Sequence, residues 1–200
     1  KAWQEAYLER LESEFARVKA EATPVVYSTL GGVWQGYVGG PDHLVPEADT
    51  AFPKEGLKNL LVRLSSVPEG FQVHPKLKRF LEARREMAEE KRPVDWATAE
   101  ALAFATLAVE GHRVRLTGQD ALRGTFTQRH AALYDYRTGE RYIPLQHLAE
   151  GQAEVEIHNS PLSEAGVLGF EYGYSLDYPE GLVLWEAQFG DFVNNAQSVI

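Results

Sequence analysis

The second half of the sequence alternates helices with short apolar strands. A helix over residues 96–109, apolar nearly all the way round and preceded by Asp95 as its N-cap, leads into a strand over residues 112–117. The same alternation continues to the end of the chain: a strand near residues 155–157, a helix over 163–174, a strand over 182–185 and a helix beginning after Phe189. This order predicts an α/β fold with a parallel sheet covered on its faces. These strands are too few to close a domain, so we expect an incomplete sheet and a fragment.

The first fifty residues predict a docking helix and an irregular segment. One apolar stripe follows residues 1–20 at steps of four and three: Trp3, Tyr7, Leu11, Phe15 and Val18. Glycines and prolines then interrupt any regular element over residues 22–53. In such a segment Trp34 and Tyr37 are more naturally packing side chains than rings that stack on a ligand.

Two amphipathic helices are predicted next, over residues 54–66 and 75–90. The second has proline in its first turn, a position that proline favours. With the strands beginning after residue 94, the chain divides into two expected regions. Residues 1–93 form a helical and irregular linker, and residues 94–200 form the beginning of an α/β domain.

Composition excludes several classes of protein. Lys and Arg number 20 against 29 Asp and Glu, a net charge of -9 that disfavours nucleic acid, and the basic stretch at residues 76–85 is interleaved with acids as on a solvated helix face. We find neither an apolar run of about 18 residues nor a signal-peptide layout, so we expect a soluble chain without a membrane partner. The absence of cysteine excludes disulfides and thiolate zinc sites.

Short catalytic motifs are also missing from the sequence. The six histidines show neither the i, i+4 spacing of a helical metal site nor an HExxH pattern, so we expect no metal ligands in this chain. The GxSxG, GxGxxG and GxxxxGK[ST] patterns do not occur. Hydrolase, dinucleotide-binding and P-loop functions therefore lack their minimum parts.

Two glutamates are candidates for chemistry, and each has a structural alternative. Glu164 stands in the first turn of a helix, where capping by Ser160 or Ser163 and the helix dipole could alone explain it. Leu162 and the apolar residues after it imply instead that the carboxyl group is buried, which a domain without a use for it has little reason to do. Glu186 ends a strand, where parallel sheets bind ligands, but an ion pair with a neighbouring loop explains it equally well.

Several blocks of sequence resemble one enzyme family in the same order and with similar spacing. They are VRLTGQD at 114–120, RGTF at 123–126, RHA at 129–131, NSPLSE at 159–164, LGFEYGYS at 168–175 and WEAQFGDF at 185–192, with VDWA at 94–97 upstream. The chain resembles the thiamin-diphosphate-dependent decarboxylating component of 2-oxoglutarate dehydrogenase over residues 50–200, and loosely before that. It departs from the pattern at Gln128, where relatives usually carry a histidine, and at Val193 and Asn195.

This resemblance implies that residues 94–200 are the N-terminal part of a transketolase-like pyrimidine-binding domain. By position, Glu164 matches the glutamate that bonds the 1′ nitrogen of the aminopyrimidine and favours its imino tautomer, which can then deprotonate the thiazolium ring. Phe192 matches the aromatic ring that stacks on the aminopyrimidine. Leu162 and Gln188 match residues that line the same pocket. The implied cofactors are thiamin diphosphate and magnesium, the latter held by a domain absent from this chain, because the family's diphosphate-binding motif does not occur here.

The resemblance also implies the setting of the reaction. The expected enzyme is a homodimer that oxidatively decarboxylates 2-oxoglutarate and passes a succinyl group to a lipoyl-bearing succinyltransferase, in the cytoplasm of a bacterium or the mitochondrial matrix of a eukaryote. The fragment alone is expected to be inactive. Two alternatives remain open: a related component acting on 2-oxoadipate, and a non-catalytic assembly or regulatory domain of the same fold.

Overall fold

In the computed structural model, residues 2–21, 31–161, 163–188 and 199 are described, and they divide into a unit within residues 1–40 and a unit within residues 41–200. The first unit contains helix α1 (Ala2–Glu21) and the short 3-10 helix η1 (Gly32–Trp34), so the predicted N-terminal helix is confirmed. The apolar stripe of α1 is exposed to solvent. Trp34 and Tyr37 contact each other edge to face, with 5.5 Å between ring centroids.

The second unit begins with helices whose ends follow their local sequence. After the 3-10 helix η2 (Asp42–Leu44) come α2 (Lys54–Leu64), α3 (Pro75–Ala88) and α4 (Trp96–Val109). Helix α3 has Pro75 in its first turn, and α4 begins where Asp95 accepts a hydrogen bond from the Thr98 backbone N–H at 2.8 Å. All three helices confirm the prediction to within two residues.

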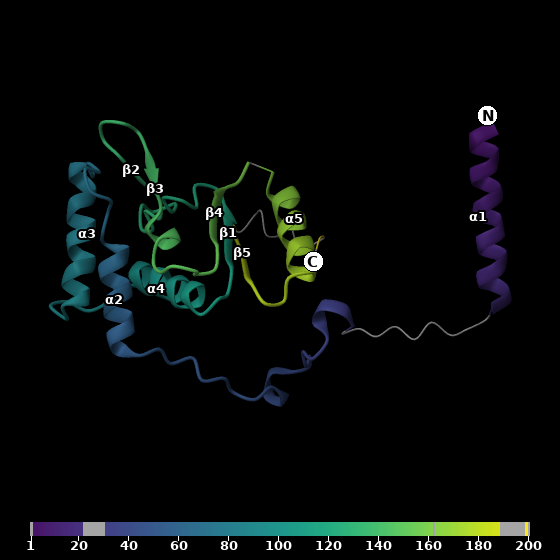
Figure 1. Cartoon of the computed structure of the whole chain (residues 1–200), viewed down its shortest axis with the longest axis horizontal. Helices are drawn as coiled ribbons and strands as arrows, with labels where there is room; N and C mark the ends of the chain where they lie inside the picture. The colour runs from purple at the N-terminus through teal and green to yellow at the C-terminus, as the bar shows by residue number, and fades with distance from the viewer. Residues whose placement is uncertain (1, 22–30, 162, 189–198, 200) are drawn as a thin grey trace. The chain divides into compact units, whose positions relative to one another are not determined.

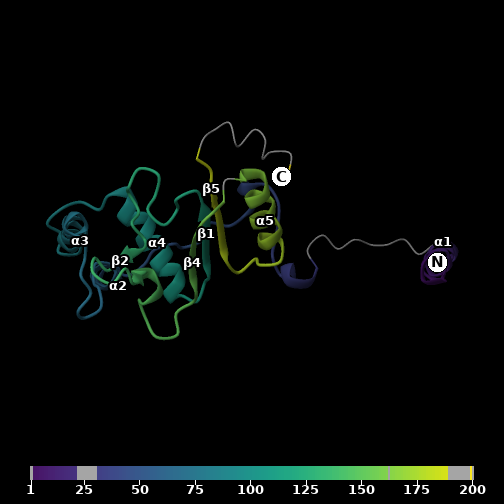
Figure 2. The same ribbon diagram turned by 90° about the horizontal axis from the view of Figure 1, so that it is seen from above.

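A three-stranded parallel sheet forms the centre of this unit (Figures 1 and 2). Its strands are β1 (Val114–Gly118), β4 (Val155–Asn159) and β5 (Leu182–Glu186), in the spatial order β4-β1-β5. A separate antiparallel pair contains β2 (Leu133–Tyr134) and β3 (Arg141–Tyr142), followed by the 3-10 helix η3 (Pro144–Gln146). The register places Gly118 opposite both Asn159 and Glu186, so the three strands end level with one another.

The two faces of the sheet differ in chemistry. Figures 1 and 2 show α4 on one face and α5 (Glu164–Leu176) on the other, as expected for a covered parallel sheet. On the α4 face a buried apolar core joins α2, α4 and the strands: Leu60, Leu64, Leu102, Ala105, Ala108, Val114, Leu116, Val155 and Ile157. On the α5 face, Arg115 carries ion pairs to Glu156 of β4 and Glu171 of α5. The sheet therefore contacts α4 through apolar groups, whereas its contact with α5 includes a buried ion pair.

Helix α4 differs from its prediction in one respect. Its sequence is apolar nearly all the way round, which predicts burial on every side, but Trp96 is 92% exposed. Residues that face α2 and the sheet are buried, among them Ala101, Ala105 and Ala108. In the described part of the chain, α4 is therefore covered on one side and more exposed on the side that carries Trp96.

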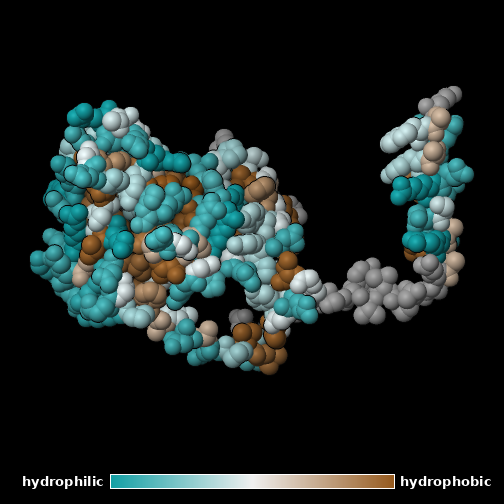
Figure 3. All heavy atoms as spheres, viewed as in Figure 1, coloured by the Kyte–Doolittle hydropathy of each residue, from teal (hydrophilic) through white to brown (hydrophobic). Residues whose placement is uncertain are grey.

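The surface of this unit is mostly hydrophilic in the view of Figure 3, as the excess of acidic over basic residues suggests. Among the described helices, none combines the length and the apolar character that crossing a membrane requires.

Candidate functional site

The carboxyl ends of the three parallel strands form one edge, where such sheets bind ligands. Their close approach depends on Gly118, because a Cβ atom at this position would lie 2.7 Å from the backbone oxygen of Glu186. The Ser160 backbone N–H, just after β4, donates to the Gly118 carbonyl at 2.8 Å. The residues that follow these strands are therefore brought together, and they include Gln119, Gln188 and the start of α5.

Glu164 is the first residue of α5 and is only 5% exposed. Its Oε1 accepts a hydrogen bond from the side-chain amide of Gln119. Its Oε2 is buried and has no hydrogen-bond partner among the described residues. Ser163 occupies the N-cap position without a side-chain capping bond, so the predicted role of Ser163 as a side-chain cap is not seen. A buried carboxylate oxygen without a partner is costly, which favours a ligand over the helix dipole as the reason for Glu164.

Glu171 is a second buried carboxylate in the same helix. It lies two turns after Glu164 and is 3% exposed. Arg115 donates to its two oxygens at 2.8 and 3.0 Å, and the Thr117 hydroxyl donates at 2.7 Å. The charge of Glu171 is therefore balanced and both of its oxygens are bonded, which Glu164 lacks.

Gln188 lies at the same edge as Glu164. Its amide nitrogen donates to the backbone oxygen of Gln119 at 2.8 Å and to the hydroxyl of Thr125. The structure thus connects two of the residues predicted from the sequence, Glu164 and Gln188, through Gln119. The other two, Leu162 and Phe192, lie outside the described residues.

Glu186 belongs to an ion-pair cluster, as its structural alternative predicted. Arg129, 4% exposed, donates two hydrogen bonds to Glu186 at 2.8 and 3.1 Å, and two to Glu100 of α4 at 2.6 and 3.0 Å. A fifth bond reaches the Ala121 carbonyl at 2.8 Å. Burial lowers the pKa of Arg129, but the hydrogen bonds and charges of the two glutamates raise it by more, so the guanidinium stays charged. Glu186 therefore anchors a loop.

The loop between β1 and β2 carries most of these contacts and is held in an unusual backbone conformation. Asp120, Thr127 and His130 have positive φ angles of 55°, 61° and 41°, which non-glycine residues rarely adopt. Burial, followed by the charges of Arg123 and Arg84, lowers the pKa of His130, so its ring is neutral at pH 7. The backbone strain of these positive φ angles persists only where surrounding contacts fix the backbone, and it is common at binding sites.

Sequence reasoning missed Gln119 and Arg129 as members of this edge. Gln119 comes two residues after the predicted strand over residues 112–117, and position at the carboxyl end of a parallel strand was the available signal. Arg129 gave no such signal, because its partner Glu186 lies 57 residues away.

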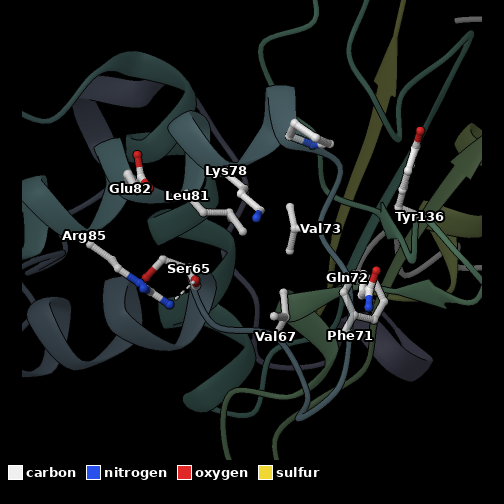
Figure 4. Close-up of a pocket in the computed structure, with 11 residues that line it drawn as sticks. Ser65, Val67, Phe71, Gln72, Val73, Lys78, Leu81, Glu82, Arg85 and Tyr136 are labelled. Atoms are coloured by element: carbon white, nitrogen blue, oxygen red, sulfur yellow. Dashed lines mark hydrogen bonds between the residues drawn. The ribbon is translucent and has the colours of Figure 1, made fainter.

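Two cavities lie near helices α3 and α5. One of about 360 Å³ is lined by residues beside the start of α5, among them Thr117, Ser160 and Ser163. The other, of about 560 Å³, lies between α3 and the β2–β3 region and is lined by Lys78, Arg85 and Tyr136 (Figure 4). In Figure 4 the dashed line marks the bond from Arg85 to the Ser65 carbonyl, 3.2 Å long. Neither cavity is lined by Glu164 or Gln188, and the sheet edge remains the candidate because the contacts of Gln119 bring these two residues together there.

A metal site is not evident in the part of the chain that the structure describes, where His, Cys, Asp and Glu do not gather in groups of three.

Comparisons with known proteins identify the family that this chain resembles. The family model described as the transketolase pyrimidine binding domain matches residues 92–200. The chain is 50% identical over 197 residues to proteins named 2-oxoglutarate dehydrogenase E1 component in Brucella ovis and Brucella canis, and 49% identical to that of Brucella melitensis. The match covers 96% of this chain and 19% of the relative, so the chain spans about a fifth of the length of these relatives.

Proposed function

The chain belongs to the transketolase pyrimidine-binding domain family, and from that premise we propose that it binds the aminopyrimidine ring of thiamin diphosphate within a 2-oxoglutarate dehydrogenase decarboxylating subunit. The names of these relatives support 2-oxoglutarate as the substrate, because half of the aligned residues are identical to theirs. One observation in the structure carries the proposal for this chain: the buried Oε2 of Glu164 has no partner among the described residues.

The residues present fit such a ring. An aminopyrimidine offers a ring nitrogen at the 1′ position, and a carboxyl group can share a proton with it. Glu164 has one oxygen fixed by Gln119 and one available, and its buried position keeps water from competing for that oxygen. In our proposal Leu162 and Gln188 line the pocket, and Phe192 stacks on the ring.

When bound, thiamin diphosphate supplies the carbon nucleophile and the electron sink for decarboxylating a 2-oxo acid. The contribution of this chain is to hold the aminopyrimidine and to keep a proton on its 1′ nitrogen through Glu164. General acid–base catalysis requires a proton-transferring side chain at a fixed position, and the carboxyl group of Glu164 meets that requirement. In our proposal the magnesium ion is bound by a different part of the longer protein.

The rest of the enzyme is also part of the proposal. We propose a homodimer in which residues 94–200 pair with the diphosphate-binding region of the second subunit, and a lipoyl-bearing succinyltransferase that receives the acyl group. We propose the bacterial cytoplasm as the location of this enzyme.

The test is Glu164→Gln in the full-length subunit, with deuterium exchange at thiazolium carbon 2 as the measured step. The amide preserves size but cannot share a proton with the ring, so we expect exchange to slow by about 100-fold or more. Glu171→Gln is the matched control, since it neutralises a second buried carboxylate on the same helix. It should lower the free energy of unfolding by about 3 kcal/mol and leave exchange in the folded enzyme unchanged.

Equal exchange rates in Glu164→Gln and the parent enzyme would remove Glu164 from the mechanism. In that case the non-catalytic assembly domain would become the better explanation of the fold.

A further inference from the structure

The two buried carboxylates of α5 are held by partners of different charge. Glu171 is bonded by the guanidinium of Arg115, a cation that balances its charge. Glu164 is bonded by the amide of Gln119, a neutral donor. An ionised carboxylate only accepts hydrogen bonds, so the amide nitrogen of Gln119 is the atom that faces it. A neutral donor can orient a carboxyl group without neutralising its charge.

Gln119 is itself fixed from two sides. Its backbone follows Gly118, where β1 and β5 approach too closely for any side chain. Its carbonyl oxygen accepts the 2.8 Å bond from Gln188, and Gln188 is tied in turn to Thr125. These contacts restrict the backbone of Gln119 independently of Glu164. The side chain of Gln119 can therefore impose an orientation on Glu164, because the backbone that carries this side chain is fixed.

We propose that Gln119 is a positioning residue, whose amide holds one oxygen of Glu164 and leaves the other for the ring nitrogen of the cofactor. This inference rests on the proposed function of Glu164. It assigns to the Gln119–Gln188 pair the task of orienting a carboxyl group that carries no cationic partner among the described residues. Removing the amide should leave Glu164 buried but free to turn, which misplaces the group that meets the ring.

The test uses Gln119→Met in the full-length subunit, because methionine has a similar length and cannot donate a hydrogen bond. Gln128→Met is the matched control: it lies in the same loop, and its side chain bonds the Phe126 backbone N–H at 2.9 Å instead of Glu164. Equilibrium affinity is measured for thiamin diphosphate and for an analogue in which CH replaces the 1′ nitrogen. Folding of each variant is followed by thermal unfolding.

We expect Gln119→Met to weaken binding of thiamin diphosphate about 10-fold relative to the control and to leave the affinity for the analogue nearly unchanged. A general structural defect would weaken both ligands equally, and that result would overturn the inference. So would equal behaviour of Gln119→Met and Gln128→Met.

The two levels of the proposal fail differently. If Glu164→Gln weakens binding of thiamin diphosphate more than binding of the analogue, and Gln119→Met does not, only the positioning role of Gln119 is lost. If neither variant discriminates, the assignment of Glu164 to the ring nitrogen is wrong as well. A variant of Gln119 that does not fold can be replaced by Gln119→Leu, which tests the same missing donor.

Discussion

Replacing Arg129 by methionine should destabilise the second unit more than any exposed ion pair could. All five N–H groups of the guanidinium are bonded: two to Glu100, two to Glu186 and one to the Ala121 carbonyl. Breaking a fully buried ion pair costs about 3–5 kcal/mol, because the remaining charge is left unpaired. The side chains of Glu100 and Glu186 are 34% and 28% exposed, so they regain some hydration. We therefore expect a loss of about 3 kcal/mol, the lower end of that range.

The assay is equilibrium unfolding of the chain in urea at pH 7. With a slope of about 1–3 kcal/mol per molar, a loss of about 3 kcal/mol lowers the midpoint by roughly 1–3 M. Arg123→Met is the control within the same loop, because Arg123 pairs with Asp120 at the surface and such pairs contribute about 0–1 kcal/mol. If Arg129→Met shifted the midpoint no further than Arg123→Met, the cluster would be no stronger than a surface ion pair and the reasoning would be refuted.

Two further predictions concern a loop anchor and the cofactor ring. Hydrogen bonds from the Gln72 backbone N–H, then from Thr138 and Arg137, lower the pKa of Asp135 to about 2. The stabilising effect of Asp135 should therefore be complete above about pH 4 and be lost as the pH falls toward 2. The difference in urea midpoint between the parent chain and Asp135→Asn should shrink between about pH 4 and pH 2, and a constant difference would contradict this prediction. Phe192→Ala in the full-length subunit should weaken thiamin diphosphate binding about five-fold, from ~1 kcal/mol of ring stacking, and a fall in melting temperature with unchanged affinity would identify Phe192 as a packing residue.

The helices could be predicted closely because the signals that begin them are local. Pro75 and Asp95 act on backbone groups within three residues, and α3 and α4 begin at the predicted positions. The exposure of Trp96 could not be predicted in the same way. Hydropathy shows that every side of α4 tolerates burial, but which side is covered depends on where α2 and the sheet pack.

The site could be predicted only in part. Glu164 and Gln188 came from the family resemblance, and the sequence alone left Glu164 open between a helix-end role and chemistry. Their connection through Gln119 was not predictable, because it spans 45 residues to Glu164 and 69 to Gln188. Glu186 stayed undecided for the same reason: its partner Arg129 becomes a neighbour only when β5 pairs with β1.

The strand order β4-β1-β5 has a consequence for how the chain acquires its fold during synthesis. Strand β1 is central, yet both of its neighbours come later in the sequence. Gly118 can pair with Glu186 only after 68 more residues have been synthesised. At translation rates of about 5–20 residues per second, the edge of β1 that pairs with β4 remains unpaired for roughly 2–8 s and the edge that pairs with β5 for roughly 3–14 s, while α2, α3 and α4 can already associate. An unpaired strand edge is a template for pairing with another chain. The cations Arg113, just before β1, and Arg115, within it, can reduce that hazard in the nascent chain, before their glutamate partners on β4 and α5 have been made.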